Sequence, residues 1–287
     1  MLNPQCVYML AADHRWQWEE WCDARSIARS RIPEVKRIAY DGFMQAREQS
    51  PDVRVNGALL IDEQYAADVI AAAMKAGITV GTPAEKPGAV PLAWTAEPFS
   101  RALTGAFVKV LVRYRPEDDV AVREGQWEKL DALQTWCRSA GKPLVVEILV
   151  ARRQEPEEEF DSSGRPAILA GVIGEAYRRG LVPDFWKIEG SPSAAGARIV
   201  DAAIAARPSV RQIILGKGAD LPTIDRWFAA VASCATAVGF AIGRSVVWDP
   251  AAAFLSGTTD ARHAAAEMAG TYLRLVNAWN DRRVASS

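Results

Sequence analysis

Short apolar runs rich in β-branched residues recur along the chain, and between them lie stretches whose apolar residues repeat at helical spacing. This alternation is typical of βα units that feed one parallel sheet. Amphipathic stretches such as 65–75 and 126–140 precede strands, and Gly77, Gly141 and Gly180 are expected to end helices. The pattern predicts eight strands, at residues 7–12, 57–61, 77–80, 107–112, 143–149, 184–189, 211–215 and 237–242.

Eight βα units predict a TIM (β/α)8 barrel of the α/β class, formed by residues 1–287 as a single domain. Apolar residues make up 49% of the chain, which is enough to bury one large core. An open doubly wound sheet is the alternative. It lacks support because no Gly-x-Gly-x-x-Gly follows the first predicted strand, and no linker divides the chain.

Charge and cysteine usage narrow the class of partner. The 34 lysine and arginine residues balance 35 aspartate and glutamate residues, so we expect no nucleic acid or membrane partner, and any anion site must be local. The four cysteines are far apart and form no CxxC pair, which indicates a reduced, cytoplasmic protein without a zinc cage or a disulfide framework. We also expect no signal peptide and no membrane span. Barrels of this kind commonly associate through their outer helices, so a homo-oligomer is expected.

Polar residues occur at the predicted strand ends, where TIM barrels build their chemistry. The alternation of side chains along strands four, five and six places Lys109, Glu147 and Lys187 on the inner face. Their neighbours are expected to face the helices. The other strand-end groups are Asp13, His14, Arg15, Asp62, Glu63, Gln64, Glu189, Lys217 and Arg244.

Two amines and a carboxylate inside a barrel mouth indicate carbonyl chemistry. Burying an ammonium is costly unless it is paired or neutralised, and the neutral amine is the nucleophile that attacks a ketone. A second ammonium and a low dielectric would lower the pKa of Lys187, and Glu147 could carry protons. We therefore predict a Schiff-base lysine at position 187. The alternative is a buried ion-pair network without catalytic duty.

Glycines after strands seven and eight predict a phosphate site, because loops at these positions of a barrel often bind phosphate through backbone N–H groups. The candidate residues are Gly216, Lys217, Gly218, Gly243 and Arg244. Plain turns are the alternative for each glycine pair.

No metal or other cofactor is predicted, because His14 and His263 are too few for a three-histidine site. A cation bound through the oxygens of Asp13, Asp62 and Glu63 is the alternative.

Residues 152–166 are predicted to form a solvated loop that could also act as a lid. Tryptophans at helical spacing, namely Trp127, Trp136, Trp227 and Trp279, are expected to be packing residues.

The strand-end residues resemble the class I aldolases of the tagatose-bisphosphate and sulfofructose-phosphate type, together with the 2-deoxy-5-keto-gluconate-6-phosphate aldolase of bacterial inositol catabolism. The resemblance spans nearly the whole chain. The lysine-x-glutamate at positions 187–189 is its most specific motif. The resemblance is carried by residues 12–15 (Ala-Asp-His-Arg), 60–65 (Leu-Ile-Asp-Glu-Gln-Tyr), 108–111 (Val-Lys-Val-Leu), 146–147 (Val-Glu), 186–189 (Trp-Lys-Ile-Glu) and 243–244 (Gly-Arg).

The resemblance implies roles for four residues and a phosphorylated small-molecule substrate. Lys187 would form the imine, Lys109 would tune it, and Asp13 would orient the substrate. Glu147 would exchange protons with the hydroxyl that becomes the aldehyde. Apart from these four roles, we expect Glu189 and Arg15 to contribute to substrate binding. The turn at residues 216–218 departs from the serine-containing turn of the tagatose type, which makes Arg244 the better phosphate candidate.

The inositol-pathway aldolase is the member that the chain resembles best, because Trp16, Trp18 and Trp21 follow the Asp-His-Arg of residues 13–15. Its reaction yields dihydroxyacetone phosphate and malonate semialdehyde. The distal carboxylate of that substrate would need a cation, for which Arg15, Lys86 and Arg113 are candidates. An aldolase for tagatose bisphosphate or sulfofructose phosphate is one alternative, and a non-catalytic metabolite-sensing barrel is another.

Overall fold

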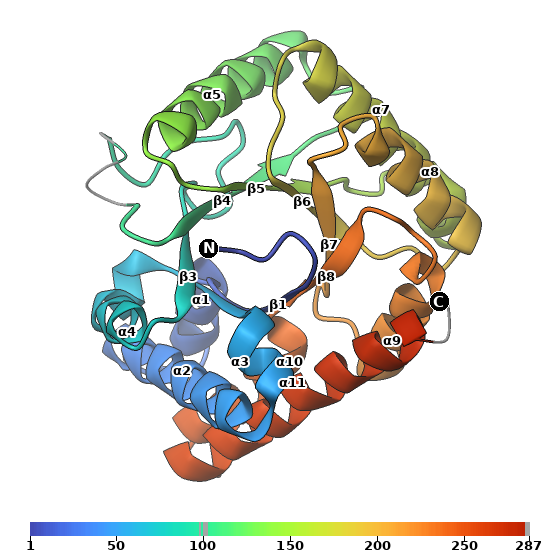
Figure 1. The fold of residues 1–287 in the computed structure, drawn as a ribbon. Helices are drawn as coiled ribbons and strands as arrows, with labels where there is room; N and C mark the ends of the chain where they lie inside the picture. Colours follow the sequence, from blue (N-terminus) through green and yellow to red (C-terminus); the bar gives the residue numbers. More distant parts are fainter. Residues whose placement is uncertain (98, 100–102, 285–287) are drawn as a thin grey trace.

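The computed structural model describes residues 1–97, 99 and 103–284, and it is a closed barrel of parallel strands in the order β1 to β8 (Figure 1). The predicted TIM barrel is confirmed. The strands are β1 (Val7–Ala12), β2 (Gly57–Ile61), β3 (Thr79–Pro83), β4 (Phe107–Arg113), β5 (Leu144–Leu149), β6 (Phe185–Glu189), β7 (Arg211–Leu215) and β8 (Ala237–Ile242).

Seven of the eight predicted strands lie within one residue of their observed bounds, and the third begins and ends later in the chain than predicted. Gly77 has a φ of +71° and belongs to the turn that ends the preceding helix, so it cannot begin a strand. The strand starts at Thr79 and continues to Pro83. The correction matters for function, because the residues that follow β3 reach the mouth of the barrel.

Helices surround the barrel as an outer ring (Figure 1). Aspartate or serine side chains cap the N-termini of α4, α5, α8 and α9, as helix starts favour. The long helices α2 and α11 pack against each other. The helices are α1 (Trp16–Asp23), α2 (Ile32–Gln49), α3 (Pro51–Asn56), α4 (Glu63–Lys75), α5 (Val120–Ser139), α6 (Glu157–Glu159), α7 (Arg165–Arg178), α8 (Ala194–Ala205), α9 (Leu221–Val231), α10 (Arg244–Leu255) and α11 (Ala261–Val284), with a 3-10 turn at Arg29–Arg31.

The core has an inner and an outer layer, as the alternation along the strands predicted. Phe107, Val145 and Phe185 belong to the apolar cluster inside the barrel, and Leu2 from the N-terminal segment joins them. Val108, Val110, Val146, Ile148, Trp186 and Ile188 pack in a separate cluster between sheet and helices. Inward-facing positions further along β4, β5 and β6 are therefore available for polar groups. The four tryptophans predicted as packing residues also lie in or against the outer clusters.

Residues 152–166 are more ordered than the predicted solvated loop. They contain the short helix α6, a π-helical turn at Phe160–Gly164 and the start of α7. Phe160 is buried, and Arg165 lies against its ring. Because the segment is rich in acidic residues, its sequence did not indicate that Phe160 would be buried. Within the described part of the chain, no helix is long and apolar enough to cross a membrane.

Candidate active site

A cavity of about 270 Å³ opens at the C-terminal ends of the strands. Nearly all of the predicted site residues line it, although they come from distant parts of the chain. The exception is Glu189, which is not among the described residues that line the cavity. The predicted residues that line it are Asp13, Arg15, Lys109, Glu147, Lys187, Gly216, Lys217, Gly218, Gly243 and Arg244.

Lys187, Glu147 and Lys109 form a continuous chain of contacts at the base of this cavity. The Lys187 ammonium nitrogen donates to Glu147 Oε2 over 2.9 Å, and Lys109 Nζ lies 3.2 Å from the same oxygen. Glu147 and Lys187 are direct neighbours in the register of β5 and β6. Parallel register between adjacent strands thus brings together side chains that lie 40 residues apart in the sequence.

Lys109 has a richer acidic environment than the sequence predicted. Its ammonium nitrogen lies 2.9 Å from Asp13 Oδ2 and 2.8 Å from Glu85 Oε1, in addition to the contact with Glu147. Burial by itself would lower the pKa of Lys109, but the three carboxylates outweigh burial and raise that pKa well above its ordinary value. Lys109 therefore stays protonated and acts as a fixed positive charge.

The pKa values of two carboxyl groups that contact Lys109, those of Glu147 and Asp13, shift in the opposite direction. Burial would raise the pKa of Glu147, but the ammonium groups of Lys187 and Lys109 hold it below its usual range. Burial likewise opposes ionisation of Asp13, yet Lys109 and Lys187 lower the pKa of its carboxyl group. Both residues are thus carboxylates at neutral pH, and Glu147 can accept a proton.

Glu85 is the main site residue that the sequence analysis missed. It follows β3 by two positions and lines the cavity, where its carboxylate receives a hydrogen bond from Lys109. The predicted third strand ended at position 80, so Glu85 was not recognised as a strand-end group. Placing the end of the strand at Pro83 would have supplied the signal.

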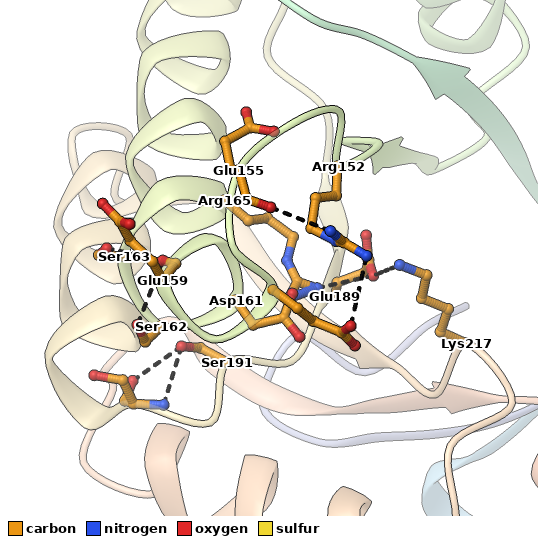
Figure 2. A network of polar contacts seen from close by, with 12 residues as sticks. Arg152, Glu155, Glu159, Asp161, Ser162, Ser163, Arg165, Glu189, Ser191 and Lys217 are labelled. Carbon is orange, nitrogen blue, oxygen red and sulfur yellow. Dashed lines mark hydrogen bonds and ion pairs between the residues drawn. The ribbon is translucent and has the colours of Figure 1, made fainter.

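Glu189 forms part of a separate polar network beside the mouth. Its Oε1 lies 3.0 Å from Arg165 Nη1 and 2.6 Å from Lys217 Nζ. Arg165 also pairs with Asp161, and Figure 2 shows Asp161 of the π-helical turn, Arg165 of α7 and Lys217 of the loop after β7 around Glu189. The alternation of side chains along β6 predicts that Glu189 lies on the substrate-facing side with Lys187. Instead, this carboxylate pairs with Arg165 and with Lys217, and of these two cations Lys217 also lines the cavity.

Glycines and Arg244 form one side of the cavity. An ideal Cβ on Gly243 would lie 2.0 Å from the carbonyl oxygen of Ala11, so only glycine allows β8 to approach β1 so closely here. Arg244 begins α10 and donates to the carbonyl oxygen of Lys217, which ties the turns after β7 and β8 together. Burial lowers the pKa of Arg244, but a guanidinium remains charged at neutral pH. This side of the cavity therefore offers a cation beside glycine backbone.

A second basic group lines another part of the cavity, formed by Arg15, Lys86 and Arg113. Arg15 is 4% exposed and donates through Nη2 to the carbonyl oxygen of Glu85 over 2.7 Å. Its Nε is buried without a hydrogen-bond partner among the described residues. All three cations suggested for a distal carboxylate thus line the cavity.

The alternative cation site is not formed. Asp62 caps α4 by accepting a hydrogen bond from the backbone N–H of Tyr65, and Glu63 accepts from Thr104, so neither carboxylate joins Asp13. In the described ranges, no group of three or more histidine, cysteine, aspartate or glutamate residues is placed to hold a metal. His14 lines the cavity, and burial lowers its pKa to about 4, so its imidazole is neutral.

The fold is shared with solved structures of low sequence identity. Cgl0159 from Corynebacterium glutamicum matches with a TM-score of 0.61 and 16% identity, over 95% of this chain and 88% of that chain. A Schiff-base-forming fructose-1,6-bisphosphate aldolase matches with a TM-score of 0.59 and 16% identity, over 94% of both chains. Fructose-bisphosphate aldolase from Plasmodium falciparum matches with a TM-score of 0.68 and 10% identity, over 99% of this chain and 92% of that chain.

Sequence comparison gives the family directly. No curated protein matches the sequence. A family model described as "Uncharacterized protein conserved in bacteria (DUF2090)" matches residues 3–283. Because this match covers nearly the whole length, the chain belongs to the DUF2090 family.

Proposed function

We propose that the protein is a class I aldolase that cleaves a phosphorylated keto substrate through an imine on Lys187. The observation that carries this proposal is the contact of the buried Lys187 amine with Glu147, 2.9 Å away, beside a permanently charged Lys109. The structural similarity to a Schiff-base-forming aldolase supports the same reaction class.

The choice between the two lysines follows from their partners. Lys109 contacts three carboxylates, which keep it protonated and therefore not nucleophilic. Among the described residues, Lys187 pairs only with Glu147, and that carboxylate can accept its proton. The neutral Lys187 amine then attacks the ketone, and Glu147 returns its proton to the hydroxyl group that departs from the carbinolamine. Loss of this water gives the iminium ion and leaves Glu147 as a carboxylate again.

Glu147 is also placed for the carbon–carbon step. It would remove the proton of the hydroxyl group on the carbon that leaves, so that this carbon becomes an aldehyde as the bond breaks. The bonding electrons move into the iminium to give an enamine on Lys187. The enamine is then protonated and hydrolysed. The positive charge of Lys109 stabilises the ionised carboxylate between turns of this cycle.

The distribution of cationic residues around the cavity supports a substrate with an anionic group at each end. Arg244 and the turns at Gly216 and Gly243 suit a phosphate. Arg15 and its basic neighbours suit a second anion. We propose 2-deoxy-5-keto-gluconate 6-phosphate, whose cleavage gives dihydroxyacetone phosphate and malonate semialdehyde. Tagatose bisphosphate and sulfofructose phosphate also carry two anionic ends and are the alternative substrates.

Borohydride trapping tests the imine. The protein is incubated with dihydroxyacetone phosphate, reduced with sodium borohydride and digested, and the modified peptide is located by mass spectrometry. We expect the adduct on Lys187, and we expect Lys187→Ala to remove it while circular dichroism shows an intact barrel. An adduct on Lys109 would reverse the roles of the two lysines. The absence of any adduct in the wild-type protein would contradict the imine mechanism and favour a sensing role.

Turnover of the three candidate substrates identifies the specificity. Release of dihydroxyacetone phosphate is measured with a coupled dehydrogenase for 2-deoxy-5-keto-gluconate 6-phosphate, and release of triose phosphate is measured for the other two. We expect the keto acid to have the highest kcat/KM. Equal values for all three would remove the preference for it, without affecting the imine mechanism.

A further inference from the structure

A third buried lysine, Lys36, lies on α2 outside the barrel wall, where the proposed chemistry does not use it. Its side chain is fully buried. The ammonium nitrogen donates to the carbonyl oxygens of Ala12 and His14, each over 2.6 Å, and lies 2.6 Å from Asp62 Oδ2. A charge in this position requires a reason, because burying an ammonium is costly even when it is paired.

The two carbonyl groups belong to the residues on either side of Asp13. Strand β1 ends at Ala12, where its pairing with β2 also ends, so Asp13 lies beyond this ladder. Two carbonyl oxygens that converge on one ammonium restrict the backbone between them. Asp13 lines the cavity, with its carboxylate 2.9 Å from Lys109.

Asp62 connects the same lysine to the neighbouring unit of the barrel. One of its carboxylate oxygens caps α4, and the other faces Lys36. Lys36 therefore joins the end of β1 to the turn after β2 from behind the cavity. Two roles could account for it: a counter-charge that merely neutralises Asp62, or a clamp on the backbone around Asp13.

We propose that Lys36 is a positioning residue that holds Asp13 against Lys109 at the active site. This inference rests on the proposed aldolase function. Within the described residues, no strand pairing holds Asp13 in place. A displacement of about 1 Å in a reacting group can cost about 100-fold in rate. A fully charged hydrogen-bond donor is a strong way to fix two carbonyl groups.

A pair of variants separates the two roles. Lys36→Met alone would leave Asp62 as a buried, unpaired carboxylate, so its effects would mix loss of folding with loss of function. Asp62→Asn removes the negative charge but keeps an oxygen that can cap α4 and leaves the bonds from Lys36 to the two carbonyls. The double variant K36M/D62N removes both charges together. The comparison of D62N with K36M/D62N therefore isolates the contacts around Asp13.

We expect D62N to keep kcat within about threefold of wild type, whereas K36M/D62N should lose about 10- to 100-fold in kcat with KM nearly unchanged. Thermal midpoints measured for both variants show whether each is folded. Equal kcat in the two variants would overturn the proposal and leave Lys36 as a counter-charge. A KM that rises in step with the loss of kcat would also overturn the proposal.

Crystal structures of the two variants provide a readout that does not depend on turnover. The contact between Asp13 and Lys109 should stay near the present 2.9 Å in D62N and lengthen in K36M/D62N. If the wild-type protein formed no imine, the proposed function would fail, yet this distance would still test the clamp. An unchanged distance in the double variant would contradict it.

Discussion

Replacing Lys109 with methionine tests whether one ammonium group holds three carboxylates together at the barrel mouth. The ammonium lies 2.9 Å from Asp13, 2.8 Å from Glu85 and 3.2 Å from Glu147. At an effective dielectric constant of about 20, each attraction amounts to about 5–6 kcal/mol. Methionine preserves much of the side-chain volume but leaves three carboxylates facing one another without that charge.

The expected net loss is smaller than the sum of these attractions. The desolvation of each ion opposes its attraction, and the carboxylates can take up protons once the ammonium is gone. Removing one partner of a buried ion pair typically costs about 3–5 kcal/mol. We therefore expect the free energy of unfolding of the Lys109→Met variant to fall by about that amount at neutral pH.

The loss of unfolding free energy in the Lys109→Met variant should depend on pH in a defined direction. In the wild-type protein, Asp13 and Glu147 have lowered pKa values, so they contribute stability above their unfolded pKa values and lose it as the pH falls through the folded ones. Without Lys109, burial would raise the folded pKa of one carboxyl group above its unfolded value. Its contribution is then fully present below the unfolded pKa and is lost as the pH rises, by about 1.4 kcal/mol per pH unit for one proton.

Urea denaturation followed by circular dichroism, at about pH 5 and about pH 7.5, measures this difference. Lys75→Met is the matched control, because Lys75 is exposed on α4 and should change stability by less than about 0.5 kcal/mol. We expect the deficit of Lys109→Met to be larger at the higher pH. A deficit below about 1 kcal/mol at both pH values, or a constant deficit, would refute the assignment of Lys109 as the charge that stabilises the cluster.

Three further predictions follow from the geometry of the site. Glu147→Gln should still give some borohydride adduct on Lys187 but slow carbon–carbon cleavage by about two to four orders of magnitude, and undiminished turnover would exclude Glu147 as the proton carrier. Gly243→Ala should lower the free energy of unfolding by about 1–3 kcal/mol in urea titrations, because its Cβ would lie 2.0 Å from the Ala11 carbonyl oxygen, whereas Gly125→Ala in an open part of α5 should not. Arg165→Met should lower the free energy of unfolding by about 1.5–3 kcal/mol in urea titrations, because Lys217 is then the one ion-pair partner left to the buried Glu189 among the described residues. Trapping at Lys187 should persist, and a loss of trapping would place Arg165 in the catalytic machinery instead.

The barrel and the center of the candidate site could be predicted from the amino-acid sequence alone. Strand periodicity fixes which side chains share a face, and adjacent parallel strands place their C-terminal ends at one rim. Lys109, Glu147 and Lys187 could therefore be grouped without a structure, because local alternation and strand order suffice to bring them together. The glycine and arginine at positions 243–244 could be placed at the same rim for the same reason.

The charged groups that surround this center could not be predicted from the sequence, because they come together through tertiary packing. Glu85 enters the cluster through a connection after β3, and Lys36 reaches the end of β1 from α2. Glu189 shares a strand with Lys187, yet Arg165 and Lys217 hold it outside the cavity lining. Such contacts depend on how loops and helices pack in three dimensions. Periodicity along a strand carries no information about them, since it specifies a face of the sheet and not the partner that approaches it.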